Sequence, residues 1–204
     1  YIINSINYRS KDSILAQDFF PDTVNSVISV GDNFDKDILQ EERKRIETNL
    51  RNKGYYRFNK DFIYFEADSS VKNRTVHLIL NIHKPQIKGP DNSTVSSNHK
   101  KYKINDVYVF TNFSQKQALS EGQAYYNDLD TTFLNGIHYI SKGVDKLNKR
   151  VIQQSNFIQE GDLYSLNNAN KTYKHLNSLR LFKIINIQFN EVDSLLRDSS
   201  KTAY

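Results

Sequence analysis

The sequence predicts an α+β fold of two tandem β-α-α-β-β units, each a small mixed sheet covered on one face by two helices. Three observations lead to this prediction. Strand-like and helix-like periodicities follow one another in the order strand, helix, helix, strand, strand over residues 1–82. A tyrosine-led strand and a Gly-Asp-aromatic sequence then return later in the chain, in the same order. At 204 residues, the chain has the length of two units of about 100 residues each.

The first unit is predicted to begin with a strand and a helix. Tyr1–Tyr8 is rich in β-branched and aromatic residues, which favours a strand. Residues 11–30 are predicted to contain a helix because apolar side chains there have the spacing i, i+3 and i+4, namely Val24, Val27 and Ile28. Asp22-Thr23 behind Pro21 offers a cap for this helix, and Gly31-Asp32 ends it.

A second helix is predicted over about Lys36–Lys53. Asp35 is its expected N-cap, and Gly54 its expected left-handed C-cap. One narrow stripe of the helix is apolar and is expected to be buried, at Leu39, Ile46 and Leu50. The other faces are charged, with i, i+4 pairs expected at Glu41–Arg45 and Glu47–Arg51.

Two strands complete the first unit, which we place at residues 1–84. Asp61–Ala67 is nearly continuous in aromatic and aliphatic residues, and apolar side chains alternate with polar ones along Arg74–Ile82. Residues 85–101 contain Pro85, Pro90 and a polar run and are predicted to be a linker.

The second unit is predicted over residues 102–204. Tyr102–Val107 matches Tyr1–Ile6 as Y-x-I-N-x-[IV], and Gly161–Ser165 parallels Gly31–Asp35. Compared with the first unit, the second carries an insertion at about 111–140, in which Gly136–Ile140 is a candidate short strand. Lys183–Asn190 is a predicted strand because polar residues alternate there with Ile185, Ile187 and Phe189. A last strand is predicted to begin near Lys201 and to be incomplete.

The sequence contains no recognisable catalytic or cofactor-binding motif, so we predict that the chain is not an enzyme and needs no cofactor. It has no cysteine, and its five histidines share no metal-ligand spacing. Its net charge of +5 is spread along the chain rather than gathered into the dense stripe expected of a nucleic-acid-binding face. We therefore predict no nucleic-acid partner.

The repeated unit resembles POTRA domains. The resemblance rests on the β-α-α-β-β order, the Gly-Asp-x-aromatic sequence before the second helix, and Gly54-Tyr55-Tyr56 ahead of the next strand. Two such units in tandem resemble the periplasmic arm of BamA/TamA-type outer-membrane assembly proteins. The stretch from Glu42 to Phe58 is most similar to the TamA-like lipoproteins, TamL.

The resemblance implies a periplasmic region that is followed in the full protein by its own C-terminal β-barrel in the outer membrane. The implied partners are unfolded outer-membrane proteins and TamB-like or other assembly proteins. The implied mode of binding is β-augmentation, in which a partner strand pairs with an exposed sheet edge. On this basis the second strand of each unit is the expected docking edge, with candidate residues Tyr56, Phe58, Lys183, Asn186, Gln188 and Asn190.

Two other interpretations remain open at the level of sequence. The chain is alternatively a passive envelope spacer, or a glycan-binding module in which Tyr125, Tyr126 and Tyr139 stack on sugars. POTRA-type cell-division proteins are a third interpretation, although these usually carry one such unit rather than two.

Overall fold

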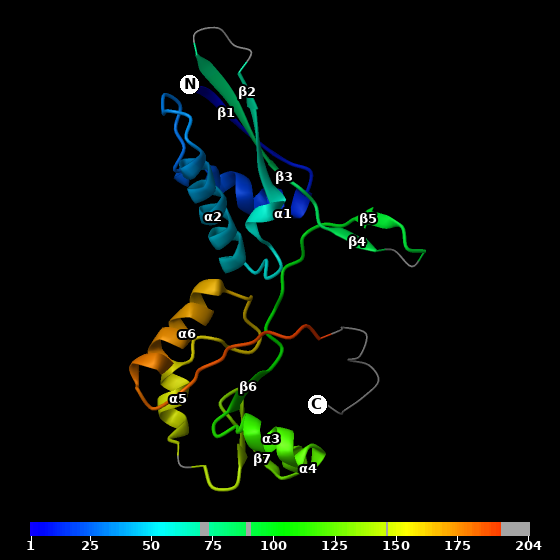
Figure 1. The fold of residues 1–204 in the computed structure, drawn as a ribbon, viewed down its shortest axis with the longest axis vertical. Coiled ribbons are helices and arrows are strands. Elements are labelled where there is room, and N and C mark those ends of the chain that lie inside the picture. The colour runs from blue at the N-terminus through cyan, green and yellow to red at the C-terminus, as the bar shows by residue number, and fades with distance from the viewer. Residues whose placement is uncertain (70–73, 89–90, 146, 193–204) are drawn as a thin grey trace.

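The computed structural model describes residues 1–69, 74–88, 91–145 and 147–192. These residues form an α+β structure with small mixed sheets, and its two halves follow one another along the long axis of the molecule (Figure 1). The elements of the first half are β1 (Ile2–Ser10), α1 (Ser13–Phe19), the 3-10 helix η1 (Phe20–Asn25), α2 (Lys36–Asn52), the 3-10 helix η2 (Lys60–Phe62), β2 (Ile63–Asp68) and β3 (Thr75–Ile82).

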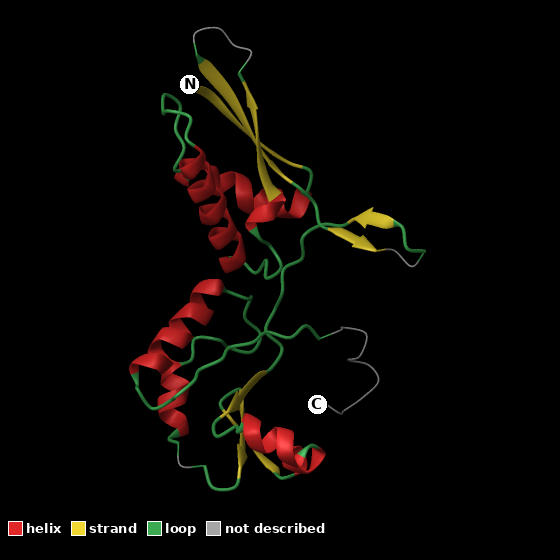
Figure 2. Cartoon of the chain, viewed as in Figure 1, coloured by secondary structure: helices red, strands yellow, loops and turns green. Residues whose placement is uncertain are grey.

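The first half has the predicted β-α-α-β-β order. Its sheet has the strand order β1-β3-β2, with β3 parallel to β1 and antiparallel to β2. Parallel pairing requires a crossover between β1 and β3, and α1 and α2 lie within that crossover. The helices lie on one side of the sheet (Figure 2). Both outer strands, β1 and β2, therefore keep one edge that is not paired within this sheet.

The core of the first half confirms the predicted stripe and the predicted alternation. Leu39, Ile46 and Leu50 of α2 are buried, and they pack in two clusters with the alternate apolar residues of β3, which are Val76, Leu78, Leu80 and Ile82. Each such side chain contributes about 1.5–3 kcal/mol on burial. Burial of these side chains between α2 and the sheet therefore stabilises this half.

The prediction for residues 11–30 was wrong in its details. The helix is α1, which starts eleven residues before Val24, and its N-cap is Asp12, whose Oδ1 accepts the N–H groups of Ile14 and Leu15 at 3.1 Å. Val24 is 85% exposed, whereas Leu15 and Phe19 fill the core. The apolar spacing around Val24 therefore did not mark a buried face, because this stretch ends as a 3-10 helix and a loop.

Helix α2 also has a charged residue in the core that the sequence prediction did not include. Glu42 is fully buried; its Oε2 accepts the N–H of Val27 at 3.0 Å, and Arg45 binds both of its oxygens. Arg45 also binds Asp22 at 2.5 Å, so it pairs with these two carboxylates rather than with Glu41 as expected. The hydrogen bond to Glu42 raises the pKa of Arg45. The other expected pair, Glu47–Arg51, is present at 3.8 Å.

The predicted linker contains regular structure. Strands β4 (Gln86–Lys88) and β5 (Thr94–Ser96) form an antiparallel hairpin that projects sideways from the junction of the two halves (Figure 1). After the hairpin, the chain returns to the first half, where His99 is buried. The last part of this segment is thus anchored.

The opening segment of each half is joined to a Gly-Asp loop by the same pattern of backbone hydrogen bonds. In the first half, three hydrogen bonds join the Gly-Asp loop to the strand: Gly31 N to Ile3 O, Ile3 N to Asp32 O and Phe34 N to Tyr1 O, at 2.8–2.9 Å. The equivalent bonds of the second half, at the same lengths, are Gly161 N to Ile104 O, Ile104 N to Asp162 O and Tyr164 N to Tyr102 O. The two loops that the sequence comparison paired therefore occupy equivalent places.

The second sheet is built differently from the prediction. The elements are β6 (Val107–Phe110), α3 (Gln115–Glu121), α4 (Gln123–Asn127), β7 (Leu129–Leu134), β8 (Ile137–Lys142), α5 (Lys149–Ser155) and α6 (Leu166–Ser178). The strand order is β6-β8-β7, with β8 parallel to β6. The central strand β8 therefore comes largely from the predicted insertion. Side chains of α5, α6 and their flanking segments pack against one face of this sheet, around Ile137, Tyr139 and Ile152.

Two further sequence predictions concern the end of the chain. Lys183–Asn190 forms no strand, and the second sheet takes its three strands from residues 107–142 instead. The last strand predicted near Lys201 lies outside the described residues. Within the described part of the chain, no helix has the length and apolar character that crossing a membrane requires.

The contrast between Leu15 and Val24 can be tested by truncation. Leu15→Ala should lower the free energy of unfolding by about 2–5 kcal/mol because it leaves a cavity in a closed core. Val24→Ala should change it by less than about 0.5 kcal/mol, since Val24 is on the surface. Both values come from urea unfolding followed by circular dichroism. A larger loss for Val24 than for Leu15 would contradict this assignment of the core.

Candidate docking surfaces

The two halves meet where the C-terminal end of α2 approaches the N-terminal end of α6. Asn52, the last residue of α2, accepts the backbone N–H of Asn167 at 2.7 Å and the hydroxyl of Ser165 at 3.4 Å. Asn52 thus adds a cap to α6 from the other half of the molecule. Because one helix ends where the other begins, the negative end of the α2 dipole faces the positive end of the α6 dipole, which is favourable.

Four aromatic rings form the centre of this junction. The ring of Tyr56 lies 4.9 Å from that of Tyr164, 5.7 Å from Tyr102 and 5.9 Å from Phe189. Tyr164 and Phe189 are themselves 5.0 Å apart in an edge-to-face arrangement. These are the separations at which aromatic pairs attract beyond their burial, by about 0.5–1.5 kcal/mol for each pair. Tyr56 is the ring that the other three share.

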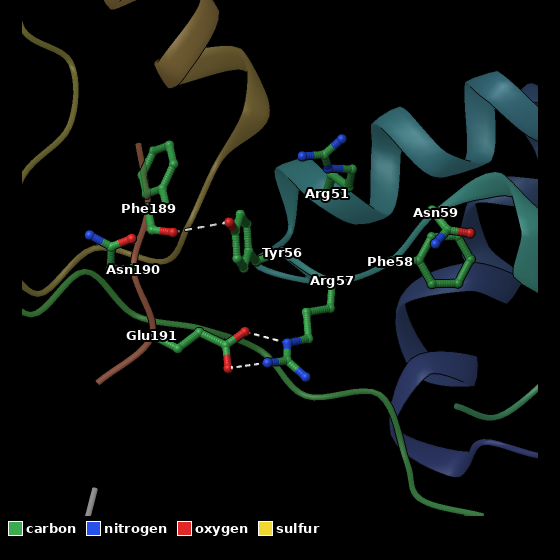
Figure 3. A pocket seen from close by; sticks show the side chains of 8 residues that line it. All are labelled: Arg51, Tyr56, Arg57, Phe58, Asn59, Phe189, Asn190 and Glu191. Atoms are coloured by element: carbon green, nitrogen blue, oxygen red, sulfur yellow. Dashed lines mark hydrogen bonds and ion pairs between the residues drawn. The ribbon is translucent and has the colours of Figure 1, made fainter. Parts of the chain in front are cut away.

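Polar contacts surround this aromatic cluster. The Tyr56 hydroxyl donates to the carbonyl of Phe189 at 3.1 Å, and Arg51 Nη2 donates to the Tyr164 hydroxyl at 2.9 Å. The guanidinium of Arg57 forms two hydrogen bonds with the carboxylate of Glu191, one of them at 2.6 Å (Figure 3). The hydrogen bond that Arg57 donates to Glu191 raises the pKa of Arg57. Arg57 is exposed, so the aromatic rings, rather than this ion pair, contribute most to the junction.

Gly54 permits the close approach of the two halves. Its φ of +102° is in the left-handed region, as predicted for a C-cap. A side chain at this position would also meet the second half, because an added Cβ would lie 3.3 Å from Cδ2 of Leu163. The Gly54 carbonyl accepts the N–H of Tyr102 at 2.9 Å. The positive φ thus favours glycine at the helix end, and a side chain here would also be in tight contact with Leu163.

A buried pair anchors the linker to the first half. Asp12 accepts the backbone N–H of His99 at 2.6 Å, and its Oδ2 lies 3.0 Å from His99 Nδ1. Rings of Phe58 and Phe62 pack on the imidazole. Burial lowers the pKa of His99, although the Asp12 carboxylate acts in the opposite direction. Burial alone would raise the pKa of Asp12, but the hydrogen bonds from His99 and Leu15 outweigh it and the pKa is lowered.

A crevice of about 700 Å³ opens beside the aromatic cluster (Figure 3). One wall comes from the end of α2 and the loop that follows it, and the other from the segment before residue 192. The lining residues are Arg51, Tyr56, Arg57, Phe58, Asn59, Phe189, Asn190 and Glu191. Two of the predicted docking stretches, one from each half of the sequence, therefore lie against each other here.

The predicted docking residues occupy three kinds of environment. Tyr56 contacts the second half, as described. Phe58 is 2% exposed and belongs to the first core, so it offers no surface to a partner. Neither residue lies on an edge strand, because β2 begins only at Ile63. The remaining four are exposed on the C-terminal segment and are Lys183, Asn186, Gln188 and Asn190.

The C-terminal segment keeps the burial pattern of a strand without being one. Ile185, Ile187 and Phe189 are half-buried, whereas the polar residues between them are exposed. Among the described residues, this segment has no ladder partner. The segment therefore lies on the protein surface, and its backbone N–H and C=O groups are not part of either three-stranded sheet.

One edge strand of the second sheet was not predicted from the sequence. Strand β7 is the outer strand of the second sheet, and Phe133 on it is 59% exposed. The signal was present in the sequence: Thr-Thr-Phe-Leu is followed by Asn135-Gly136, and both of these residues have positive φ, as a tight hairpin turn requires. The junction contact of Asn52 and the linker contact of His99 had no such local signal, because their partners are far away in sequence.

The tyrosines predicted to bind glycans do not form a common surface. Tyr125 is fully buried and Tyr139 is 2% exposed, while Tyr126 is 49% exposed. A stacking platform made of all three is therefore excluded. Among the described residues, no cluster of histidine and carboxylate side chains has an arrangement that would hold a metal ion.

No protein-family model and no curated protein matches the chain. Among solved structures, the chain is similar to Haemophilus influenzae BamA POTRA3-5 at 9% identity, with a TM-score of 0.35, over 95% of this chain and 91% of that one. It is similar to the N-terminal domain of Omp85 from the thermophilic cyanobacterium Thermosynechococcus elongatus at 10% identity, with a TM-score of 0.28, over 92% and 89% of the two chains. It is similar to POTRA1-3 of the periplasmic domain of Omp85 from Anabaena at 12% identity, with a TM-score of 0.27, over 91% and 87%.

Removing the ring of Tyr56 should loosen the junction. The chain has no cysteine, so spin labels can be placed specifically by Val24→Cys in one half and Leu119→Cys in the other, both highly exposed positions. We expect a narrow distance distribution that broadens in Tyr56→Ala, while Tyr56→Phe keeps it narrow because the ring contacts remain. An unchanged distribution in Tyr56→Ala would show that other contacts hold the halves together.

The Asp12–His99 pair should make stability depend on pH. Below about pH 6.5 the unfolded chain protonates His99, whereas the folded chain, in which the pKa of His99 is lowered, resists protonation. The unfolded state then binds more protons, so the free energy of unfolding should fall as pH decreases through this range. The fall should be smaller in His99→Gln and unchanged in His83→Gln, an exposed control. Equal slopes in wild type and His99→Gln would contradict the role assigned to this pair.

Proposed function

We propose that the chain is a non-enzymatic docking region, in the periplasm, of a factor that assembles or translocates outer-membrane β-barrel proteins. On this proposal, residues 1–84 and 102–204 are two POTRA-like units joined by the 85–101 linker. In the full protein they serve a C-terminal β-barrel of the same polypeptide. The proposed clients are unfolded outer-membrane proteins, and TamB-like or other assembly proteins are the proposed partners.

The observation that most supports docking is the unpaired extended segment Lys183–Asn190. The side chains of Ile185, Ile187 and Phe189 are half-buried, those of Ile184 and the polar residues are exposed, and the segment borders the crevice at the junction. Main-chain groups of such a segment pair with an incoming strand whatever the side chains of that strand are. Because main-chain pairing does not depend on the side chains of the incoming strand, it suits a receptor for many barrel precursors. The polar residues Asn186, Gln188 and Asn190 would keep the segment soluble while it is unpaired.

The edge of β2 is a weaker candidate than this segment. The exposed end of β2 carries Glu66 and Asp68, and charged residues on an edge strand discourage further pairing. We therefore infer that strand addition takes place at Lys183–Asn190 rather than at β2.

The alternative function is that of a passive spacer. The contacts of Tyr56, Arg57 and Asn52 favour a fixed arrangement of the two units, which a spacer also needs. A spacer would hold the units apart without binding clients, so client capture separates the two functions.

A photo-crosslinking amino acid in place of Asn186 or Gln188, in the full-length protein in its native envelope, should capture barrel precursors or an assembly partner. The same residue in place of Val24 is the control, since Val24 is a highly exposed residue of the first unit. Capture at Asn186 and Gln188 above the Val24 level supports docking. Capture of nothing, or of glycan alone, would leave the spacer or glycan-binding function instead.

A backbone substitution tests the mode of binding. Gln188→Pro removes one main-chain donor, so it should lower crosslinking from position 186 several-fold, while Gln188→Ala should leave the yield close to wild type. Melting temperatures of both variants control for folding. Equal yields from the two variants would rule out strand addition at this segment.

A further inference from the structure

Phe189 and Glu191 are held at the junction by side chains rather than by strand pairing. The Phe189 ring lies 5.9 Å from the ring of Tyr56 and 5.0 Å from that of Tyr164. Two positions further on, the Glu191 carboxylate accepts two hydrogen bonds from the guanidinium of Arg57 (Figure 3). Among the described residues, no ladder pairs this stretch. Tyr56, Arg57 and Tyr164 together thus bind an aromatic side chain followed two positions later by a carboxylate.

This site is open to solvent beside the stretch that fills it. The crevice of about 700 Å³ is lined by Tyr56 and Arg57 on one side and by Phe189 and Glu191 on the other. Arg57 and Glu191 are both exposed, so their ion pair is screened by water and is readily exchanged for another. Arg51 also lines the crevice, and two guanidinium groups there face a single lining carboxylate. The charge of the crevice therefore favours an acidic ligand.

The stretch can leave the site without disrupting either sheet. The two three-stranded sheets are built from β1, β2 and β3 and from β6, β7 and β8, so neither includes Phe189. Phe182, where the segment begins, packs separately in the core of the second unit. Without Phe189, Tyr56 would still have its ring contacts with Tyr102 and Tyr164. The two units would therefore stay joined, and the site would be preformed for another ligand.

We propose that Phe189-Asn190-Glu191 is an internal ligand, and that a segment of a partner protein displaces it. The partner segment has an aromatic residue followed two positions later by Asp or Glu, the pattern that the chain itself supplies. In the free chain the internal ligand lowers the apparent affinity, because only molecules with an empty site bind the partner.

This exchange is separate from the docking proposed above. A ligand here replaces the Phe189 ring, whereas strand addition pairs with the backbone around Asn186 and Gln188. Loss of either activity would leave the other in place.

A peptide with the chain's own sequence tests the exchange. The probe is a fluorescein-labelled peptide of residues 184–191, amidated at its C-terminus so that its only carboxylate is the glutamate side chain. Its Kd for the chain is measured by fluorescence anisotropy. The Phe189→Ala chain should bind it about tenfold or more tightly than wild type, because the internal competitor has lost its ring. Gln188→Ala, an exposed position in the same segment, is the control and should leave the Kd unchanged.

The matched peptide with alanine in place of its phenylalanine should lose most of its affinity for the Phe189→Ala chain. Equal affinities of the wild-type and Phe189→Ala chains, or equal binding of the two peptides, would overturn the proposal. Melting temperatures of the variants check that the chain stays folded.

A charge exchange tests the role of Arg57. In the Phe189→Ala chain, Arg57→Glu should weaken binding of the peptide about threefold, as expected for an exposed ion pair. A peptide with lysine in place of its glutamate should recover the loss. If Arg57 were needed only for the local fold, both peptides would be weakened alike, and that result would overturn the assignment of a carboxylate ligand.

Displacement is also measurable with the wild-type Phe189 in place. Because the chain has no cysteine, a nitroxide label can be attached at Gln188→Cys alone. Excess peptide should sharpen its electron paramagnetic resonance spectrum, since the segment is released, while a label at Leu119→Cys should not change. A spectrum that stays the same, or that broadens as strand addition to the segment would make it do, would overturn displacement.

Discussion

The ring of Tyr56 is the interaction on which the placement of the two units depends. It contacts Tyr102, Tyr164 and Phe189, which come from the start, the middle and the end of the described part of the second unit. One side chain thus joins three separate segments to the end of α2. Gly54 makes this contact possible, because its left-handed backbone ends α2 and leaves room for Leu163. The cap that Asn52 provides to α6 then aligns the two helices end to end.

This junction also positions the segment that we propose as the docking site. Phe189 is fixed by Tyr56 and Tyr164, and Glu191 is held by Arg57, so the segment before them is tethered at its C-terminal end. Phe182, at its other end, packs in the core of the second unit. Between these two anchors the backbone remains unpaired among the described residues. A tethered but unpaired segment loses less conformational entropy on accepting a partner strand than a free chain would.

Local patterns in the sequence were enough to predict much of the first unit, but they did not predict the second sheet or the junction. The stripe of Leu39, Ile46 and Leu50 and the alternation in β3 are both periodic, and both are confirmed. Helix α1 has only seven residues, too few for its Leu15 and Phe19 to stand out from the apolar residues around Val24. Strand β8 pairs with β6 across α3, α4 and β7, and no local signal in a sequence specifies such a distant partner. Tyr56 was predicted as a docking residue for a partner strand; the ring contacts that the structure gives it are within the same chain.

Hydrogen exchange at the backbone amides of Ile184–Asn190 tests the central claim most directly. In the free chain these amides should exchange fast, since the described structure gives them no ladder partner. On addition of an unfolded barrel precursor, the account predicts that they become protected by an order of magnitude or more, while the amides of β2 change little. Protection of β2 with no change at Ile184–Asn190, or no protection at either, would contradict the account.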